Sequence, residues 1–348
     1  MFKRKLPVAA RYLAAMSQRG GIDLGGTKIQ AVVVGDDHDV LGESRHETPT
    51  IGGPQDVADA MVRALTEAAE AAGVEPGALA GIGVGSPGDV DGKAGTVTSA
   101  RNLPDWEGSF PLAATLEKAL GAPVAIGNDV QVATDAEFAI GAAKPYKSVL
   151  GVFWGTGVGG GIVLDGKPWV GRSAGGEIGH VVVKLGGRRC PCGRRGCMEA
   201  YAGRGAMEAR ARRLQKKGEH TELFKIMEQR GRNRLTSGVI ARALRRGDRM
   251  AQELMDTAVE ALGAGVGSVC NVLDPEAVVI GGGLGLRMGE PYVERIAAAM
   301  RPHVFAETMP DIKLAQLGDL GGAIGAALLA ENAKPATRTR PRRAAAAS

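Results

Sequence analysis

Three cysteines and one histidine near the middle of the chain restrict its folding more than any other feature. Cys190, Cys192 and Cys197 fall within eight residues, and His180 stands ten residues before the first of them. One imidazole and three thiolates make a complete tetrahedral ligand set for Zn²⁺. A full protein ligand set leaves no position for water, so the spacing predicts a structural zinc site.

A disulfide is the alternative interpretation of these cysteines. A bond between Cys190 and Cys192 would close a strained ring, and pairing any two of the three thiols would leave one over. The chain has only four cysteines in 348 residues, which is too few for a disulfide scaffold and typical of the reducing cytoplasm. The fourth, Cys270, falls on an apolar helical face and is expected in the core.

Positive charge is concentrated at the two ends of the chain. The formal net charge is +5, but residues 1–20 and 334–348 each carry five basic residues and no acid. The rest has 33 basic and 38 acidic residues and is mildly acidic, which argues against nucleic-acid binding. We expect both ends to be flexible basic extensions.

Neither membrane insertion nor targeting is predicted. No run approaches 18 consecutive apolar residues, so no transmembrane helix is expected. Arg11 interrupts the apolar stretch at the start of the chain, and no clear cleavage site follows it. We therefore expect a cytoplasmic protein.

Strand and helix patterns alternate along the chain, which predicts an α/β fold. A strand–glycine turn–strand unit occurs twice, at 22–34 and 149–164, and this repetition predicts two similar lobes with a cleft between them. Further strands are predicted near 40–48 and at 82–85, 124–126 and 277–280. Helices are predicted at 54–73, 111–120, through most of 200–263, and at 257–273 and 321–330.

Two glycine-rich turns are candidate phosphate sites. Asp23–Lys28 and Gly155–Gly161 each join two predicted strands, and their small residues expose backbone N–H groups to an anion. Asp23 could hold Mg²⁺ through water. Each turn could also be a plain hairpin, and no Gly-Lys-Ser/Thr triplet of a P-loop occurs. Two such turns together with an acid favour a nucleotide-phosphate site.

Several carboxylates are candidates for binding and proton transfer. Asn128 and Asp129 follow a predicted strand, where α/β sheets place ligands, and an aspartate there can accept a proton from a substrate hydroxyl. Glu177 and Glu199 flank the metal ligands, and with His180 they are suitable acceptors for the hydroxyls of a polyol. Each acid alone could instead be a surface or helix-capping residue.

These motifs together resemble the ROK family, which comprises repressors, open reading frames and sugar kinases. The resemblance covers about residues 20–332, and its most specific part is Gly175–Glu199 with the His-Cys-Cys-Cys set. The segment Asn102–Trp106 is similar to the glucokinases of the family. One departure is that the family often reads Ala-Asn where this chain has Val130-Gln131, which puts the local helix packing in question.

The resemblance implies a fold with two α/β lobes, the actin-like ATPase fold of the ribonuclease H-like class, with a cleft that closes on a sugar. The family tendency predicts a homo-oligomer, a dimer or tetramer. The chain would divide into a flexible extension at 1–20, an N-terminal lobe at 21–127 completed by a helix at 321–332, a larger C-terminal lobe at 128–320 with a zinc loop at 180–197, and a disordered tail at 333–348.

The resemblance also implies roles for single residues. Asp129 would be the general base for the 6-hydroxyl of a hexose, most simply glucose. The sugar would be bound by Asn102, Asn128, Asp129, Glu177, His180 and Glu199. ATP with Mg²⁺ would be bound by Asp23, Gly25, Gly26, Thr27, Lys28, Gly155, Thr156, Gly157, Gly159, Gly160, Gly282 and Gly283. The segments Gly281–Leu284 and Leu317–Gly322 would border the adenosine.

Other functions stay open at this point. An N-acetylhexosamine or another hexose could be the acceptor, and polyphosphate could be the donor. Four arginines that could meet polyphosphate, or form a solvated rim of the zinc loop, are Arg188, Arg189, Arg194 and Arg195. A sugar-sensing repressor would carry a helix-turn-helix domain before the first glycine turn, where only about 20 residues stand. An actin-like or chaperone ATPase would have no use for the metal segment.

Overall fold

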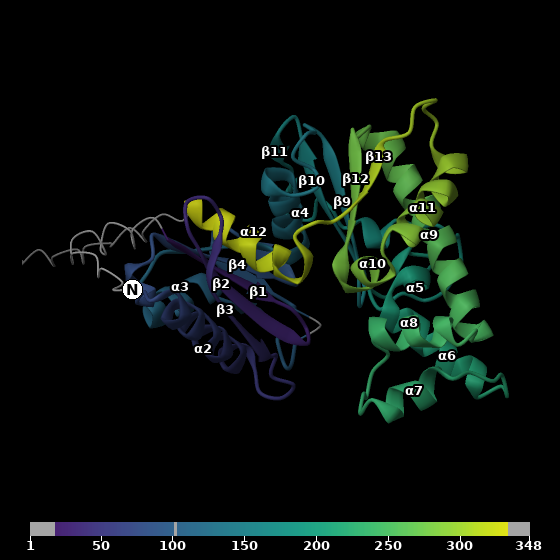
Figure 1. Ribbon diagram of the computed structural model, residues 1–348, viewed down its shortest axis with the longest axis horizontal. Helices are drawn as coiled ribbons and strands as arrows, with labels where there is room; N and C mark the ends of the chain where they lie inside the picture. The colour runs from purple at the N-terminus through teal and green to yellow at the C-terminus, as the bar shows by residue number, and fades with distance from the viewer. Residues whose placement is uncertain (1–17, 101–102, 333–348) are drawn as a thin grey trace, which may run out of the picture. The chain divides into compact units, whose positions relative to one another are not determined.

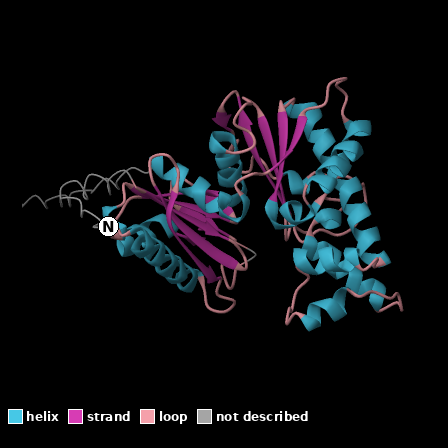
Figure 2. Cartoon of the chain, in the orientation of Figure 1, coloured by secondary structure: helices cyan, strands magenta, loops and turns pink. Residues whose placement is uncertain are grey.

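The computed structural model describes residues 18–100 and 103–332 (Figures 1 and 2). The basic ends predicted from the sequence lie almost wholly outside these residues, and so does Asn102. The extension predicted for 1–20 reached too far, because Arg19 and Gly20 already belong to the first strand, β1 (Arg19–Leu24). Gly20 is buried, and a Cβ there would lie 3.0 Å from Leu65 Cδ1, so core packing holds this segment.

Two compact units make up the chain, which divides after Gly127 and again after Gly325. The described residues from Ala326 onward therefore belong with the first unit. None of the helices in the described ranges is long and apolar enough to cross a membrane.

The first unit is built on a five-stranded sheet with the strand order β3-β2-β1-β4-β8. Strand β1 runs antiparallel to β2 and parallel to β4. The remaining strands are β2 (Lys28–Val34), β3 (Val40–Glu47), β4 (Gly81–Ser86) and β8 (Val124–Asn128). A second, three-stranded sheet consists of β5 (Asp89–Asp91), β6 (Thr96–Thr98) and β7 (Ser109–Phe110).

Helices α2 (Pro54–Ala72) and α3 (Leu112–Leu120) pack beside the main sheet and confirm the periodicity of the sequence (Figure 1). A short turn, η1 (Pro76–Ala78), follows α2. Gly73 ends α2 in the left-handed conformation with φ 72°, as a glycine cap should. A Cβ on Gly42 of β3 would lie 2.2 Å from Ala68 O, so α2 can approach the sheet only over a glycine.

The second unit repeats this plan with the strand order β11-β10-β9-β12-β13. Its central strand β9 runs antiparallel to β10 and parallel to β12, as β1 does with β2 and β4. The duplicated unit predicted from the sequence is thereby confirmed. The strands are β9 (Val149–Trp154), β10 (Val158–Leu164), β11 (Lys167–Pro168), β12 (Ala277–Gly281) and β13 (Asp311–Leu314).

Helices cover both faces of the second sheet, with α4 (Asp129–Ile140) on one face and α9 (Arg249–Leu273) and α11 (Glu290–Met300) on the other (Figure 1). The other helical elements of this unit are η2 (Ile178–His180), α5 (Glu199–Ala202), α6 (Arg204–Gln215), α7 (Leu223–Gln229), α8 (Ser237–Arg245), α10 (Gly282–Met288), η3 (Arg301–His303) and η4 (Gly318–Leu320). Helix α12 (Gly321–Leu329) contains the boundary between the units, and η5 (Ala330–Asn332) belongs with the first unit.

The second glycine turn is shorter than the sequence predicted. We expected it at Gly155–Gly161, but β10 begins at Val158, and the later glycines lie within the strand. A Cβ on Gly151 or Gly161 would lie 2.1 Å from Thr134 Oγ1 of α4. Strand glycines are therefore required here by the close approach of a helix, and not only by a ligand.

The bulky pair Val130-Gln131 fits the packing of α4 against β10. The buried side chain of Gln131 pairs with the backbone of Ile162, whose N–H donates to Oε1 at 2.9 Å and whose carbonyl accepts from Nε2 at 3.0 Å. Val130 lies over Gly159, where a Cβ would come within 2.7 Å of its Cγ2. The structure therefore accommodates both residues that depart from the family pattern. Val130 fits because Gly159 has no side chain, and Gln131 fits because it forms two hydrogen bonds with Ile162.

Asp135, one turn further along α4, has a raised pKa. Its Oδ1 accepts a hydrogen bond from Gln131 Nε2 at 2.7 Å. Burial raises the pKa of Asp135 to about 7, and the hydrogen bond from Gln131 offsets only part of this rise. The folded protein therefore keeps a proton on Asp135 that the unfolded chain loses near its ordinary pKa of 3.8.

We predict that Asp135→Asn removes a pH-dependent loss of stability. Stability falls with rising pH wherever the folded state binds more protons, here from about pH 4 to about pH 7. The rise of the pKa from 3.8 to about 7 sets a ceiling of roughly 4 kcal/mol on the effect. Urea unfolding at several pH values should show the variant gaining on the wild type as pH increases. The exposed Asp37→Asn is the control, and a constant difference between Asp135→Asn and wild type would contradict the prediction.

Candidate functional site

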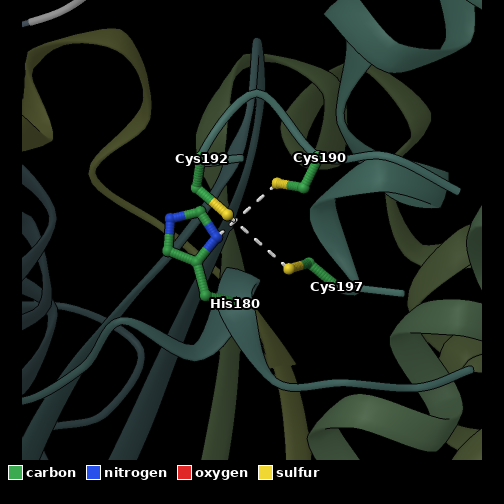
Figure 3. A group of neighbouring side chains, drawn as sticks. All are labelled: His180, Cys190, Cys192 and Cys197. Atoms are coloured by element: carbon green, nitrogen blue, oxygen red, sulfur yellow. Dashed lines mark hydrogen bonds between the residues drawn. The ribbon is translucent and has the colours of Figure 1, made fainter. Parts of the chain in front are cut away.

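The four predicted metal ligands converge in the structure. Figure 3 shows His180 of η2 facing Cys190, Cys192 and Cys197 of the loop before α5. The candidate ligand atoms all lie within 4.8 Å of one another. The distances from Cys192 Sγ to Cys197 Sγ and from Cys190 Sγ to His180 Nδ1 are both 3.8 Å. Tetrahedral zinc with Zn–S bonds near 2.3 Å requires sulfur atoms about 3.8 Å apart, so the donors fit a metal ion.

The loop that carries the cysteines is folded tightly around them. Gly196 has φ 85°, and a Cβ there would lie 1.9 Å from Lys184 O. The N–H of Val183 donates to the carbonyl of Gly196 at 2.9 Å, and the N–H of Cys190 donates to that of Arg194 at 2.9 Å. The sulfur separation of 3.8 Å is far beyond the S–S bond length of about 2.05 Å, which excludes the disulfide in this structure.

Burial and neighbouring groups change the proton affinity of the cysteines. Burial raises the pKa of Cys190 and of Cys197 above the ordinary value of a thiol. The nearby carboxylate of Glu199 raises that of Cys190 further. Thiolates buried beside a carboxylate are costly without a positive partner, so a metal ion that binds here would displace the thiol protons and neutralise the thiolates.

Both predicted sugar-binding glutamates contact this cluster. Glu177 Oε2 lies 3.8 Å from His180 Nε2, so the two nitrogens of the ring face different partners. Glu199 accepts from Cys190 Sγ at 3.7 Å through Oε1 and from the N–H of Val158 at 3.1 Å through Oε2. The metal ligands and the two carboxylates therefore form one connected group, and His180 can bind metal through Nδ1 while Nε2 faces a carboxylate.

Asp129 is the first residue of α4, and Asn128 caps that helix. Asn128 Oδ1 accepts from the N–H groups of Val130 and Gln131 at 3.1 and 3.2 Å. Asp129 Oδ1 also accepts from the N–H of Val130, at 2.9 Å. A carboxylate is favoured at a helix N-terminus. The side-chain oxygen of Asn128 therefore caps the helix, and the side-chain amide nitrogen remains for the predicted sugar contact.

The second glycine turn meets the end of β12. Strands β9 and β12 are parallel, so their carboxyl ends share an edge of the sheet, where α/β proteins bind ligands. A Cβ on Gly155 would lie 4.0 Å from Gly283 N. Gly282 has φ 78° and lies so close to Trp154 that a Cβ would come within 2.6 Å of its carbonyl oxygen. Gly155–Gly157 and the start of α10 therefore form one group.

Gly159 and Gly160 do not belong to this turn, although they were predicted there from the sequence. Both lie in β10, on opposite faces of the strand. Gly159 makes room for Val130, and a Cβ on Gly160 would lie 2.8 Å from Gly176 O. Their place in the structure follows from packing, and phosphate binding by these two residues stays a prediction.

The first glycine turn lies in the other unit and is a β-hairpin turn between β1 and β2. The N–H of Gly25 donates to Lys28 O at 2.9 Å, and Thr48 Oγ1 donates to Gly25 O at 2.6 Å. Gly26 and Thr27 form the exposed tip of the turn. Asp23 lies within β1, opposite Gln30. Asp23 is the last residue of β1 that pairs with β4, and Phe153 has the corresponding position in β9, where it is the last residue that pairs with β12.

Glu137 has a structural role that was not predicted from the sequence. It is 2% exposed and accepts hydrogen bonds from the N–H groups of Ala142 at 2.9 Å, Gln316 at 3.1 Å and Leu317 at 2.8 Å. The carboxylate thus fixes the backbone that leads into η4, a segment expected to border adenosine. A glutamate within the apolar run Ala136–Ile140 was the signal, but Gln316 and Leu317, two of its three partners, lie about 180 residues away in the chain.

The profile of the ROK family matches residues 19–333, nearly all of the described chain. The chain belongs to the ROK family. A glucokinase of Thermotoga maritima is 33% identical over 312 residues, which are 88% of this chain and 95% of that protein. An N-acetyl-D-glucosamine kinase of Escherichia fergusonii is 31% identical over 89% of this chain and 98% of that protein.

A solved structure of a family member is also similar. It is the ROK family glucokinase from Streptomyces griseus in complex with glucose and AMPPNP, with 32% identity and a TM-score of 0.78. The match covers 90% of this chain and 99% of that one. At this identity and coverage the ROK fold, the actin-like sugar kinase fold, applies to this chain, as the sequence predicted.

Two substitutions distinguish the capping role of Asn128 from its predicted contact with sugar in this ROK protein. Asn128→Ala should destabilise the fold by about 1 kcal/mol, because it removes the N-cap. Asn128→Asp keeps an oxygen cap and should leave stability nearly unchanged, but it removes the amide donor predicted to contact sugar. Thermal unfolding and the KM for hexose measure the two effects. Equal KM values for Asn128→Asp and wild type would show that the amide binds no sugar.

Proposed function

We propose that this chain is a hexose kinase that transfers a phosphoryl group from MgATP to the 6-hydroxyl of glucose. The observation that carries the proposal is an aspartate at the start of a helix, directly after a sheet strand, in a ROK family chain that matches glucokinases over nearly their full length. A carboxylate in this place can accept a proton from a hydroxyl group.

Asp129 is the proposed general base. The hydrogen bond from the N–H of Val130 fixes the orientation of its carboxylate, and α4 packs rigidly on glycines of β9 and β10. Phosphoryl transfer passes through a loose transition state, so catalysis depends mainly on position and on neutralisation of charge. Asp129 would therefore orient the hydroxyl oxygen in line with the phosphoryl group and take its proton as the new bond forms.

Glu177, His180 and Glu199 are the proposed sugar-binding residues of the second unit. Their contacts with one another and with Cys190 support this role, because carboxylates held in place lose less entropy on binding hydroxyls. The N-acetyl-D-glucosamine kinase relative supports an amino sugar as the alternative acceptor. A coupled ADP-release screen over glucose, mannose, fructose and the N-acetylhexosamines decides between these acceptors.

MgATP is the proposed donor. The turn Gly155–Gly157 and the adjoining Gly282-Gly283 lie at a carboxyl edge of the sheet and would hold phosphate and adenosine groups. Asp23 would contribute to Mg²⁺ binding through water. Polyphosphate is the alternative donor, and because its use releases no ADP, formation of the hexose phosphate should be measured for it.

We assign the metal of the Cys-His cluster as structural zinc. Three thiolates and one imidazole at tetrahedral spacing form the donor set that zinc prefers, and a closed set leaves the ion without a substrate position. Zinc bound by His180 Nδ1 would fix the ring and direct Nε2–H toward Glu177 or a sugar hydroxyl. The ion then supports the sugar-binding carboxylates without taking part in the chemistry.

We predict that Asp129→Asn lowers turnover by a factor on the order of 10² to 10⁴, the usual contribution of general-base catalysis. The variant keeps the hydrogen-bond acceptor at the start of α4, so its melting temperature should stay close to that of wild type. Steady-state ADP release with saturating hexose and ATP measures the change. Unchanged turnover would rule out Asp129 as the base.

We predict that Cys192→Ser lowers the zinc content, the stability and the affinity for hexose together. Elemental analysis should find one zinc per wild-type chain and much less in the variant. Hexose affinity should fall because Glu177 and Glu199 lose a fixed neighbour. Cys270→Ala is the control, since Cys270 is buried in α9 away from the cluster. Normal hexose binding by zinc-free Cys192→Ser would separate the metal from the sugar site.

A further inference from the structure

The side chain of Arg204 lies against the second glycine turn. Its Nη2 donates to Thr156 Oγ1 at 2.7 Å, and its Nη1 donates to Ser237 Oγ at 3.2 Å. Its backbone N–H donates to Gly155 O at 3.2 Å, and that of the next residue, Gly205, donates to Thr156 O at 3.0 Å. The first residues of α6 therefore hold two of the three carbonyl groups of the turn and place a cation beside it.

This cation has no anionic partner within the described part of the chain. Its two side-chain partners are hydroxyl groups, and it forms no ion pair there. Glu208, four residues along α6, is already engaged by Arg212 at 2.6 Å and by the N–H of Leu235 at 2.8 Å. Burial lowers the pKa of Arg204, and the charge of Arg234 lowers it further while that of Glu208 opposes both. A half-buried guanidinium beside hydroxyl groups favours an anionic ligand.

The turn next to Arg204 offers further donors to such a ligand. Among the described residues, no hydrogen bond is formed by the N–H of Thr156 or of Gly157. These groups, with the guanidinium, gather at the carboxyl edge of β9 and β12. A planar guanidinium and adjacent backbone N–H groups match the non-bridging oxygens of phosphate better than a carbohydrate hydroxyl or a metal ion.

We propose that Arg204 binds the phosphate chain of the phosphoryl donor. Its guanidinium contacts oxygens of the terminal phosphates while the turn Gly155–Gly157 holds the same chain through its N–H groups. This role rests on the proposed function, because it assigns a donor-binding residue for that reaction. The same chemistry fits the phosphates of ATP and of inorganic polyphosphate.

A purely structural role would be to brace the turn through Thr156. Bracing would affect every ligand of the turn equally, whereas a phosphate contact matters more as phosphates are added. The number of phosphates on the ligand therefore separates the two roles.

The test compares Arg204→Gln and Arg204→Lys with wild type, and uses the exposed Arg213→Gln on the same helix as the control for charge. Calorimetric binding of ATP, ADP and AMP and the KM values for ATP and hexose are measured for each. For Arg204→Gln we expect the affinity for ATP to fall roughly tenfold to a hundredfold, the affinity for AMP to fall little, and the KM for hexose to stay unchanged. Arg204→Lys should recover part of the loss, and Arg213→Gln should behave as wild type.

Polyphosphate identifies the source of the phosphate chain. Weaker polyphosphate-driven turnover in Arg204→Gln, with ATP unaffected, would support phosphate binding with polyphosphate as donor. Equal losses for ATP, ADP and AMP would overturn the proposal in favour of bracing, and so would unchanged affinity for both donors. The wild-type hexose screen tests the proposed function separately, because ATP binding can be measured even where no hexose is phosphorylated.

Discussion

The close packing of α4 on the glycines of β9 and β10 is the contact on which the second unit depends. Thr134 occupies the space over Gly151 and Gly161, and Gln131 satisfies the backbone of Ile162 in the middle of the sheet. Side chains on these glycines would overlap α4 by more than an ångström. Because the contact is this close, α4 can pack on the sheet in one position only. That position fixes the start of α4, where Asp129 lies, and puts Glu137 under the segment before η4.

All four candidate metal ligands could be found from the sequence, because the ligands of one ion must be close in space and these four are also close in the chain. The spacing of Cys190, Cys192 and Cys197 restricted the geometry enough for the upstream His180 to be recognised as the fourth ligand. The strands and helices were also predictable where the apolar pattern was clear, as in the helical periodicity of α2 and the continuous apolar run of β12.

The rest of the site was not predictable from local sequence. Glycines of a turn and glycines under a helix look the same in a sequence, so Gly159 and Gly160 were assigned to the turn although β10 contains them. Asn128 was predicted as a sugar-binding residue, and its second role, the capping of α4 by its side-chain oxygen, became visible only in the structure. The partners of Glu137 and Arg204 come from distant segments, and only the folded chain brings them together.

The short segment from Cys197 to Gly205 connects the metal cluster to the turn. Cys197 is a candidate metal ligand, Glu199 reaches both Cys190 and the N–H of Val158, and Arg204 and Gly205 hold the carbonyls of the turn. The fit is tight, since a Cβ on Gly157 would lie 2.2 Å from Glu199 Oε2. A metal ion bound at Cys197 would fix the start of this nine-residue segment, which then could not shift without moving the carboxylate of Glu199 and the start of α6. Metal binding would therefore support the predicted sugar contacts and the predicted phosphate contacts through the same piece of backbone.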